Sequence, residues 1–419
     1  MKRIEKQYKE AKEYYGLLGV DTDMVLESLR HIPISIHCWQ GDDVTGFDNL
    51  GSSFGGGILV TGNFKGKARN ISELWQDIKK AFSLIPGDKK INLHSIYGDF
   101  KGKKIDRNQI APEHFKSWVE WAKNNKSGID FNPTPFSHRL AESGYTLSSK
   151  DKNIRGFWVE HIKRCMEISN YFGMNLKKPC IFNIWIPDGS KDLTISKFKH
   201  REILKDSLDE IFSVIYPEKN ILDSLESKLF GLGSECYVVG SHEFYLSYAI
   251  KYDKLITFDT GHFHPTELVS DKISSVLPYI KRIILHLSRG IRWDSDHVIV
   301  LSEEVIDIMK EIVRANAIQR VNISTDFFDA SINRIGAWVI GARAAIKSLL
   351  IAMLEPIELI KKFEDEAILF ARLGILEDTK TMPYGTIWNY YCEIMDVPGD
   401  KSWIDPVLRY EAEVLDRRK

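Results

Sequence analysis

The sequence has no excess of charge of either sign. Lysine and arginine total 57 against 58 for aspartate and glutamate, which gives a formal net charge of −1 over 419 residues. Proteins that bind nucleic acids or anionic membranes usually carry a positive field, because phosphates dominate those surfaces. This chain gives no electrostatic reason to expect either partner. A small, neutral ligand fits the charge balance better.

Long apolar runs and paired cysteines are also missing. No stretch reaches the roughly 18 consecutive apolar residues that span a bilayer. The segment Met1–Gly16 is charged and indicates the lead-in to a helix, without the apolar stretch of a secretory signal. The five cysteines are far apart and form no C-x-x-C pair, which is typical of buried free thiols. These absences predict a cytoplasmic protein with no membrane partner.

Short β-branched runs alternate with longer segments of helical periodicity. Most of the runs are nearly continuous in apolar residues, as a parallel sheet covered on both faces requires. The candidate strands are eight: Ile34–Trp39, Lys90–Tyr97, Gly128–Pro133, Pro179–Ile186, Ile221–Phe230, Leu255–Phe263, Arg282–Arg289 and Arg320–Phe328. The intervening helix patterns are Ile71–Ser83, Pro112–Asn124, Ile154–Tyr171, Arg201–Ile215, Glu243–Lys251, Glu267–Leu277 and Glu303–Ala315.

Eight strand–helix units predict an α/β fold, a (β/α)8 TIM barrel. The alternative is a doubly wound open sheet, which normally has a glycine-rich phosphate turn after its first strand. No such turn follows Cys38 and Trp39. We expect residues 1–350 to form the barrel domain with its N-terminal helix.

Two segments lie outside the regular repeat. Residues 51–70 contain six glycines where the first strand-to-helix loop is expected, and both a mobile lid and a plain surface loop fit this pattern. Residues 351–419 are helical in pattern, through Glu355–Leu373, Tyr384–Met395 and Trp403–Arg417. We expect this extension to lie outside the barrel core, in an oligomer contact or against the outer helices.

Acidic and imidazole side chains gather at the ends of the last four predicted strands. Like charges at one barrel mouth raise one another's pKa, so this grouping is unfavourable unless cations lie between them. Seven side chains are candidate ligands: Glu226, Asp259, His262, His286, Asp294, Asp296 and Asp326. Any one of them alone is more typical of a helix cap or a hydrogen-bonded core group. Together, at the active-site end of a barrel, they predict metal binding.

The residue types indicate which metals are expected. Carboxylates with a minority of imidazoles favour Mn²⁺, Mg²⁺ or Co²⁺, and the absence of a nearby thiolate argues against a structural zinc site, although Zn²⁺ can occupy such a ligand set. Seven ligands exceed the needs of one ion with open positions, so we predict two divalent sites.

Other side chains are predicted to face the same mouth. Lys228 lies two residues after Glu226, so both project from one face of an extended chain. From the first, second and fourth strands we expect the side chains of His37, Trp39, His94, Tyr97, Trp185 and Asp188. Trp185, at a strand-to-loop junction, is the preferred candidate for an apolar wall against which the C–H face of a sugar packs. A core position is the alternative for each aromatic residue.

Six segments together resemble those of bacterial L-rhamnose isomerases: SIHCWQGDDVTGF, NIWIPDGSKD, ESKLFG, DTGHFHPTE, IRWDSDHV and DFFDASINRI. The resemblance runs nearly from end to end and shows no departure at the candidate metal ligands. It implies a cytoplasmic homotetramer that prefers Mn²⁺ and converts L-rhamnose to L-rhamnulose, the first step of L-rhamnose degradation.

The resemblance also implies roles for individual residues. Glu226, Asp259, His286 and Asp326 would hold a structural metal that also contacts substrate hydroxyls. His262, Asp294 and Asp296 would hold the catalytic metal with a water. Lys228 would contact the carbonyl end of the sugar, and His94 would bind substrate and take part in ring opening. The catalytic set is therefore Lys228, His94, Asp294 and Asp326, and the substrate-binding set is Trp185, His94, Lys228, Glu226 and Asp326.

Two mechanisms and two other function classes stay open at this point. A metal-assisted hydride shift and proton abstraction to an enediol use the same residue types. A metal-dependent hydrolase also gathers such side chains at strand ends, but it predicts a basic groove for phosphates. A non-enzymatic sugar-binding module has no need of so many charged ligands. Residue types do not separate L-rhamnose, L-mannose, L-lyxose and D-allose as substrates.

Overall fold

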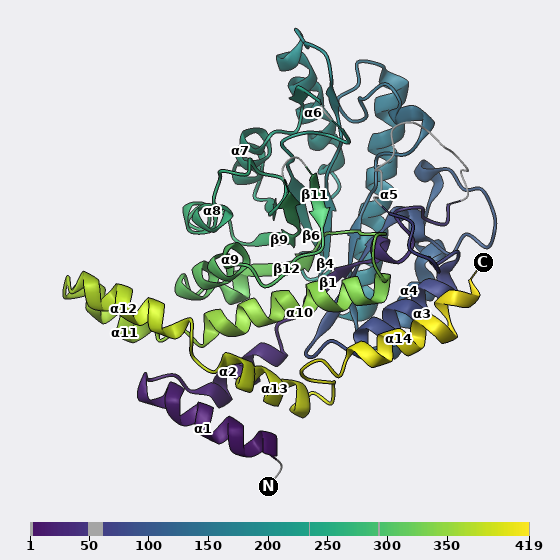
Figure 1. Ribbon diagram of the computed structural model, residues 1–419. Helices are drawn as coiled ribbons and strands as arrows, with labels where there is room; N and C mark the ends of the chain where they lie inside the picture. Colours follow the sequence, from purple (N-terminus) through teal and green to yellow (C-terminus); the bar gives the residue numbers. More distant parts are fainter. Residues whose placement is uncertain (1–2, 49–61, 234, 292–293, 419) are drawn as a thin grey trace.

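Eight parallel strands form a closed barrel in the computed structural model of the chain (Figure 1). The structure describes residues 3–48, 62–233, 235–291 and 294–418. The strand order around the barrel is β1-β12-β9-β8-β6-β4-β3-β2, and β2 pairs with β1 to close it. The barrel strands are β1 (Ile34–His37), β2 (Lys89–His94), β3 (Gly128–Asn132), β4 (Cys180–Ile184), β6 (Ile221–Glu226), β8 (Leu255–Asp259), β9 (Ile283–Leu287) and β12 (Val321–Thr325). The predicted TIM barrel is confirmed.

A helix follows every barrel strand and covers the outside of the barrel. These helices are α3 (Ile71–Phe82), α4 (Lys116–Asn124), α5 (Lys152–Leu176), α6 (Lys197–Ile211), α7 (His242–Tyr252), α8 (Val269–Val276), α9 (Glu303–Arg314) and α10 (Arg334–Met353). In α9 the buried residues Val305, Ile308, Met309 and Ile312 recur at helical spacing, so one stripe faces the barrel. Helix α5 lies so close to β6 that a Cβ on Gly173 would come within 1.9 Å of the Asn220 carbonyl oxygen, and only glycine fits there.

The predicted strands are correct in number and order but extend too far at their C-terminal ends. The prediction over Lys90–Tyr97 is an example, since β2 ends at His94 and Ser95–Tyr97 form a 3-10 turn. Lys228 likewise lies beyond the end of β6. Residues past a strand end can stay buried, as Ser95–Tyr97 do, so apolar continuity does not mark where pairing stops.

Side chains inside the barrel change from apolar to polar along the strand direction. Ile181, Leu255 and Ile284 form a small cluster with Leu222, separate from the main core. Two residues further on, the same strands place Asn183, Thr257, His286 and Ser224 on the same face, because side chains alternate along a strand. The apolar cluster forms a floor for the barrel, and the polar residues begin above it.

Two short two-stranded antiparallel sheets stand at the mouth of the barrel. One pairs β5 (Gly189–Ser190) with β7 (Tyr237–Val238), and the other pairs β10 (Arg289–Ile291) with β11 (Asp294–His297). Of the two predicted ligands in β11, the Asp294 side chain lies outside the described residues. Residues 49–61, most of the predicted glycine-bearing loop, also lie outside them.

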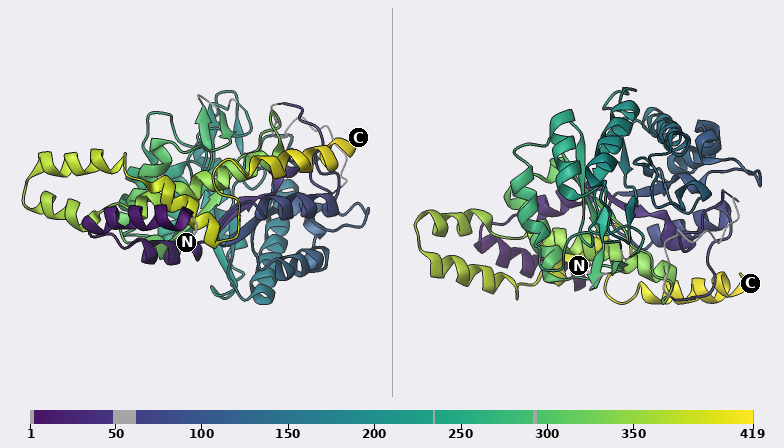
Figure 2. Two further views of the ribbon diagram at one scale, coloured as in Figure 1. Left: turned by 60° about the horizontal axis from the view of Figure 1, so that its bottom comes forward. Right: turned by 90° about the horizontal axis from the view of Figure 1, so that it is seen from above.

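Helices at both ends of the chain complete the molecule. They are α1 (Arg3–Leu17) and α2 (Thr22–Arg30) at the N-terminus, then α11 (Ile357–Asp365), α12 (Leu369–Thr379), α13 (Tyr384–Ile394) and α14 (Ile404–Glu413) after the barrel. Helices α11 and α12 form an arm that extends away from the body in every view (Figures 1 and 2). The continuous helix predicted over Glu355–Leu373 is wrong, because the chain turns between Asp365 and Leu369.

The C-terminal helices pack against helices outside the barrel and extend the main hydrophobic core. Helix α13 contacts α1 and adds Ile387, Trp388, Tyr391 and Cys392 to the main hydrophobic core. Past α14, the Arg418 side chain binds Asp77 of α3. Apolar faces of α10 and α1 are left open by the barrel itself, and α13 covers them. In the described part of the chain, α10 alone is long and apolar enough to span a membrane, and it is mostly buried inside the fold.

Candidate metal centre

A pocket of about 430 Å³ opens at the C-terminal end of the barrel strands. Side chains from every part of the barrel line it, including Trp39, His94, Trp185, Glu226 and Asp326. Active sites of this fold occupy this end of the barrel, where the strand-to-helix loops meet. The pocket is therefore the candidate functional site.

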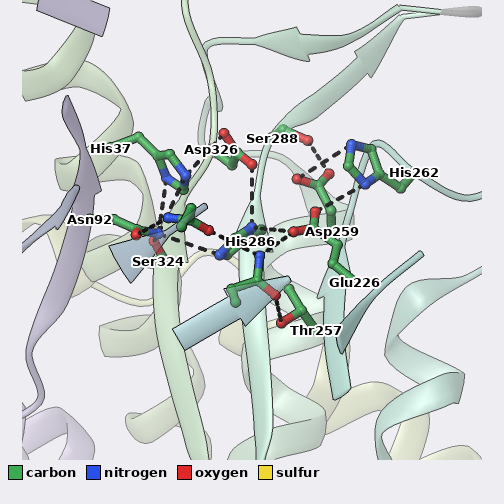
Figure 3. Close-up of polar contacts among 12 residues, drawn as sticks. His37, Asn92, Glu226, Thr257, Asp259, His262, His286, Ser288, Ser324 and Asp326 are labelled. Carbon is green, nitrogen blue, oxygen red and sulfur yellow. Dashed lines mark hydrogen bonds and ion pairs between the residues drawn. The ribbon is translucent and has the colours of Figure 1, made fainter. Parts of the chain in front are cut away.

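Four buried residues from four neighbouring strands converge at the base of the pocket (Figure 3). Glu226 ends β6, Asp259 ends β8, His286 lies in β9, and Asp326 follows β12. Register brings them together, since Asp259 pairs directly with His286 across β8 and β9. One possible ligand atom from each residue lies within 4.8 Å of the others. The structure thus brings together the four residues assigned to one metal on the basis of resemblance.

The imidazoles lie between the carboxylates. His286 Nδ1 is 3.3 Å from Glu226 Oε2 and 3.3 Å from Asp326 Oδ2. His262 Nδ1 is 3.1 Å from Glu226 Oε1, and its Nε2 is 3.9 Å from Asp259 Oδ2. His37 Nε2 is 3.4 Å from Asp326 Oδ1. No lysine or arginine within the described ranges forms an ion pair with these three carboxylates.

Several atoms in this cluster are buried without a hydrogen bond: Glu226 Oε1, Asp259 Oδ2, His286 Nδ1 and Asp326 Oδ1. A buried polar atom without a hydrogen bond costs free energy, and the nearby imidazoles offset this cost only in part, so these atoms favour a further ligand. Three carboxylates and one imidazole are donors that Mn²⁺, Mg²⁺ and Co²⁺ accept. The residues present therefore fit a divalent cation.

The charge states of the cluster depend on one another. Burial raises the pKa of Glu226, but His286 and His262 outweigh burial and bring that pKa well below its usual range. Burial lowers the pKa of His286, but Glu226 and Asp326 reverse this effect and raise that pKa well above normal. Burial raises the pKa of Asp326 to about 7, with Asp259 and Glu226 adding to it against the effect of His286. The protons held by His286 and Asp326 thus balance part of the negative charge of the three carboxylates.

Hydrogen bonds from neighbouring polar groups orient two of the carboxylates, Glu226 and Asp259. Asn183 donates to Glu226 and accepts a 2.8 Å bond from Thr257 Oγ1. Ser288 Oγ and the Gly261 backbone N–H both donate to Asp259 Oδ1, at 2.6 and 2.8 Å. These bonds occupy one oxygen of each carboxylate and leave the other oxygen for a ligand.

The second predicted ligand set is described only in part. His262 is buried, and both His262 and Asp296 line the pocket. The side chain of Asp294, the third predicted member, lies outside the described residues. Within the described ranges, the geometric grouping of ligand atoms includes neither His262 nor Asp296. The second metal site stays a prediction.

The opposite side of the pocket is aromatic and mostly uncharged. Trp39 stacks on His94 with ring centroids 4.1 Å apart, and Phe136 meets the edge of Trp185 at 5.5 Å. Lys228 Nζ lies 5.6 Å from the centre of the Trp185 ring. Burial, together with the charge of His286, lowers the pKa of His94 to about 3, so His94 is neutral. Trp39, His37, His94, Trp185 and Lys228 therefore reach the pocket as predicted.

Two residues predicted to face the mouth do not line the pocket. The Tyr97 hydroxyl donates a 2.6 Å bond to buried Asp42. Asp188 accepts bonds from the backbone and hydroxyl groups of Thr146 and Ser148. Both predictions were wrong because a strand end gives only a direction. The 3-10 turn at Ser95–Tyr97 brings the Tyr97 hydroxyl to Asp42, and the segment after β4 brings Asp188 to Thr146 and Ser148.

Residues that the sequence analysis did not name also line the pocket: Asn132, Pro133, Thr134, Pro135, Phe136 and Asn183. Asn132 ends β3, and Asn183 lies in β4. Amides near the C-terminal ends of barrel strands reach the mouth in the same way as acids, imidazoles and aromatics, so both asparagines could have been predicted from the sequence. Phe136 lies in a loop, where no periodicity predicts its direction.

Comparisons with known proteins agree over nearly the whole chain. A model of the L-rhamnose isomerase (RhaA) family matches residues 2–418. An L-rhamnose isomerase from Rhodopirellula baltica is 50% identical over 415 residues, covering 99% of this chain and 97% of that protein. One from Bacteroides thetaiotaomicron is 50% identical over 416 residues, covering 99% of each. Among solved structures, an L-ribulose 3-epimerase is similar over 78% of this chain and 98% of its own, with a TM-score of 0.48 at 11% identity.

Proposed function

The chain belongs to the L-rhamnose isomerase family and is an isomerase, and we propose that it interconverts L-rhamnose and L-rhamnulose with the help of two divalent cations. One observation carries the metal dependence: three buried carboxylates and an imidazole from four strands place ligand atoms within 4.8 Å of one another. In the cell the reaction would begin L-rhamnose degradation in the cytoplasm.

We assign the first ion to Glu226, Asp259, His286 and Asp326, and the second to His262, Asp294 and Asp296. The close grouping of the first four supports that assignment. The position of His262 and Asp296 on the same pocket supports the second. Mn²⁺ is the proposed preference, with Co²⁺, Mg²⁺ and Zn²⁺ as competitors, because the ligands are mainly carboxylates.

Aldose–ketose exchange moves one hydrogen from C2 to C1 and one proton from O2 to O1. A divalent ion in this site would polarise the carbonyl oxygen and acidify the neighbouring hydroxyl. Lys228 is close enough to the pocket to donate a hydrogen bond to O1 as negative charge develops there, a contribution often worth about 3 kcal/mol. Trp39, Trp185 and Phe136 exclude water from one side of the pocket.

His94 would bind the ring form of the sugar and assist its opening. Burial lowers the pKa of His94, so its imidazole is neutral and can form a hydrogen bond with a ring oxygen or hydroxyl of the sugar. Asp326 and Glu226 would contact sugar hydroxyls from the opposite side of the pocket. We therefore propose Lys228, His94, Asp294 and Asp326 as the catalytic residues, and Trp185 with Glu226 as additional binding residues.

The hydrogen at C2 can pass in two ways. In a dry pocket it moves to C1 as a hydride, together with its electron pair. In the enediol alternative, a carboxylate or imidazole base removes it as a proton, which then exchanges with solvent. We propose the hydride shift. Turnover in deuterated water tests it: the ketose should carry almost no deuterium at C1, and extensive deuterium there would exclude the shift.

A matrix assay tests the activity itself. Protein stripped of metal is incubated with L-rhamnose, L-mannose, L-lyxose or D-allose and with one divalent ion at a time, and the ketose is quantified. We expect L-rhamnose with Mn²⁺ to give the highest kcat/KM and stripped protein to give none. Full activity without any divalent ion would refute metal dependence, and conversion of another aldose in preference to L-rhamnose would refute the substrate assignment.

We also propose that the protein is a homotetramer. The arm formed by α11 and α12 supports an intersubunit role, since α12 has no buried residue and exposes Leu369, Phe370 and Leu373. Exposed apolar side chains grouped on one helix usually mark a contact surface. Light scattering after size-exclusion chromatography should give four times the 48.2 kDa chain mass. A monomer at micromolar concentration would contradict the proposal.

A further inference from the structure

The loop after β3 holds an uncommon backbone conformation at the pocket wall. Thr134 has φ +53° and Ser137 has φ +51°, both in the left-handed region. A β-branched residue rarely adopts this conformation, because its side chain crowds the backbone. The surrounding structure must therefore hold Thr134 in place. The same loop supplies Pro133, Thr134, Pro135 and Phe136 to the pocket.

The side chain that holds this loop is Arg107, which does not itself line the pocket. Arg107 is only 4% exposed, and it donates hydrogen bonds to the carbonyl oxygens of Thr134, Phe136 and Ser137. The Asp48 carboxylate lies 3.3 Å from Arg107 Nε and balances its charge. A planar guanidinium can reach three carbonyls at fixed angles, whereas a lysine ammonium cannot reproduce that fork.

The conformation of Thr134 determines how His94 is presented. Thr134 Oγ1 lies 2.9 Å from His94 Nδ1, and the two groups form a hydrogen bond. Trp39 also restrains the plane of the His94 ring, because the two rings stack with an interplanar angle of 24°. His94 Nε2 is buried without a hydrogen bond. The ring is thus fixed in plane and direction, with Nε2 as the nitrogen left for a ligand.

We propose that Arg107 is a positioning residue, which keeps the 133–137 loop in the conformation that lets Thr134 orient His94 toward the substrate. Arg107 touches neither the candidate metal ligands nor the pocket, so it acts through the loop. The inference rests on the proposed function, in which His94 binds the sugar. The orientation of His94 therefore depends on a residue outside the pocket.

Two substitutions test the proposal, each with a matched control. Arg107→Lys keeps the charge opposite Asp48 but loses the fork, and Arg320→Lys is its control, because Arg320 also donates to three backbone carbonyls, at the opposite end of the barrel. Thr134→Val keeps the shape but removes the hydroxyl, and Thr22→Val is its control, because buried Thr22 bonds Tyr8 far from the pocket.

We expect Arg107→Lys and Thr134→Val each to lower kcat/KM for L-rhamnose by about 10- to 100-fold, a typical cost of misplacing one group. Thr134→Ser should recover most of the activity, because it restores the hydroxyl. Both controls should stay within about twofold of the parent protein, since loss of a remote contact does not change transition-state binding. Equal losses in the controls would show that general loosening, and not the loop, reduces turnover.

The dependence on His94 is tested in a second background. If Arg107 and Thr134 act through His94, each substitution should change kcat/KM by less than about twofold when His94→Ala is already present. Undiminished losses in that background would overturn the proposal.

If the parent protein converts no L-rhamnose at all, the proposed function fails, but the positioning role is still decided by crystal structures. Thr134→Val and Arg107→Lys should show a rotated His94 ring or a relaxed Thr134 backbone. An unchanged His94 ring and loop in both variants would overturn the positioning role.

Discussion

The floor layer of the barrel interior, where Asp130 lies against Ile181 of the apolar cluster, and the mouth of the barrel both contain buried carboxylates. The two layers balance the charge of these carboxylates differently. In the floor, Asp130 is paired with Lys90 and also accepts hydrogen bonds from Ser35 Oγ at 2.7 Å and the Ile181 backbone N–H at 3.0 Å. At the mouth, imidazoles are the only cationic groups of the described residues that pair with Glu226, Asp259 and Asp326, and each carboxylate keeps an oxygen without a hydrogen bond.

The contrast between the two layers shows why the mouth favours a bound metal ion and the floor layer does not. A lysine supplied by the chain completes the Asp130 site, so no other cation is needed there. Where the chain places several carboxylates together without such a lysine, the low dielectric makes the uncompensated charge costly. The mouth therefore favours a cation from solution, and the difference between the two layers can be broken or sharpened by experiment.

The largest expected effect is at the mouth. Glu226→Gln keeps the size of the side chain but removes one charged ligand, so kcat/KM for L-rhamnose should fall by at least about 1000-fold, as expected when a reacting group loses its main electrostatic support. Metal content per chain, measured by mass spectrometry, should fall as well. Asp223→Asn is the control, because Asp223 lies on the same strand but pairs with Lys254. Unchanged metal content in Glu226→Gln would contradict the assignment.

The next effect is in the floor. Lys90→Met leaves the Asp130 carboxylate buried, at 4% side-chain exposure, without its cation. Breaking a buried pair in this way costs about 3 kcal/mol, so the free energy of unfolding should fall by that amount in urea titrations. Metal content should stay at the parent value, since the mouth is unaltered. A loss of bound metal equal to that of Glu226→Gln would show that the two layers are not independent.

Metal removal measures the same contrast without mutation. If the mouth binds Mn²⁺ in the folded state alone, adding the ion at about 100 times its Kd should stabilise the stripped protein by about 2.7 kcal/mol. Differential scanning calorimetry should therefore record a higher Tm with Mn²⁺. The rise should persist in Lys90→Met and shrink in Glu226→Gln. A Tm that does not respond to any divalent ion would sink the metal-centre interpretation.

The last prediction concerns a buried carboxylate outside both layers. Burial raises the pKa of Asp42 to about 7, although bonds from the Tyr97 hydroxyl and the Gly46 N–H oppose the rise. The folded chain holds this proton more tightly than the unfolded chain, whose aspartate pKa is about 3.9. The free energy of unfolding should therefore fall as pH rises from about 4 to about 7, by on the order of 1 kcal/mol per pKa unit.

Asp42→Asn removes this titration, so the stability of the variant relative to the parent should increase across that pH range. Thermal scans of both proteins at each pH measure the difference. A constant difference from pH 4 to pH 8 would mean that Asp42 keeps an ordinary pKa in the folded protein.

Much of the site could be predicted from the sequence, since it lies where strands end. Glu226, Asp259, His286 and Asp326 were found in this way, because parallel strands of a barrel bring their C-terminal ends to one face. Tyr97 and Asp188 were misplaced, since the turns after β2 and β4 point them into the protein. Thr134 and Arg107 gave no signal, because nothing in their local sequence shows that they meet near His94.

The sequence alone determined the order of strands and helices, the barrel that they form and the carboxylate-rich end of that barrel. Hydrophobic periodicity is a local property that each segment carries with it. Tertiary structure alone decided which carboxylate receives a lysine, which loop residue orients His94, and how α13 joins the core. Those outcomes depend on contacts between residues 40 or more positions apart, and only the closed fold brings such residues together.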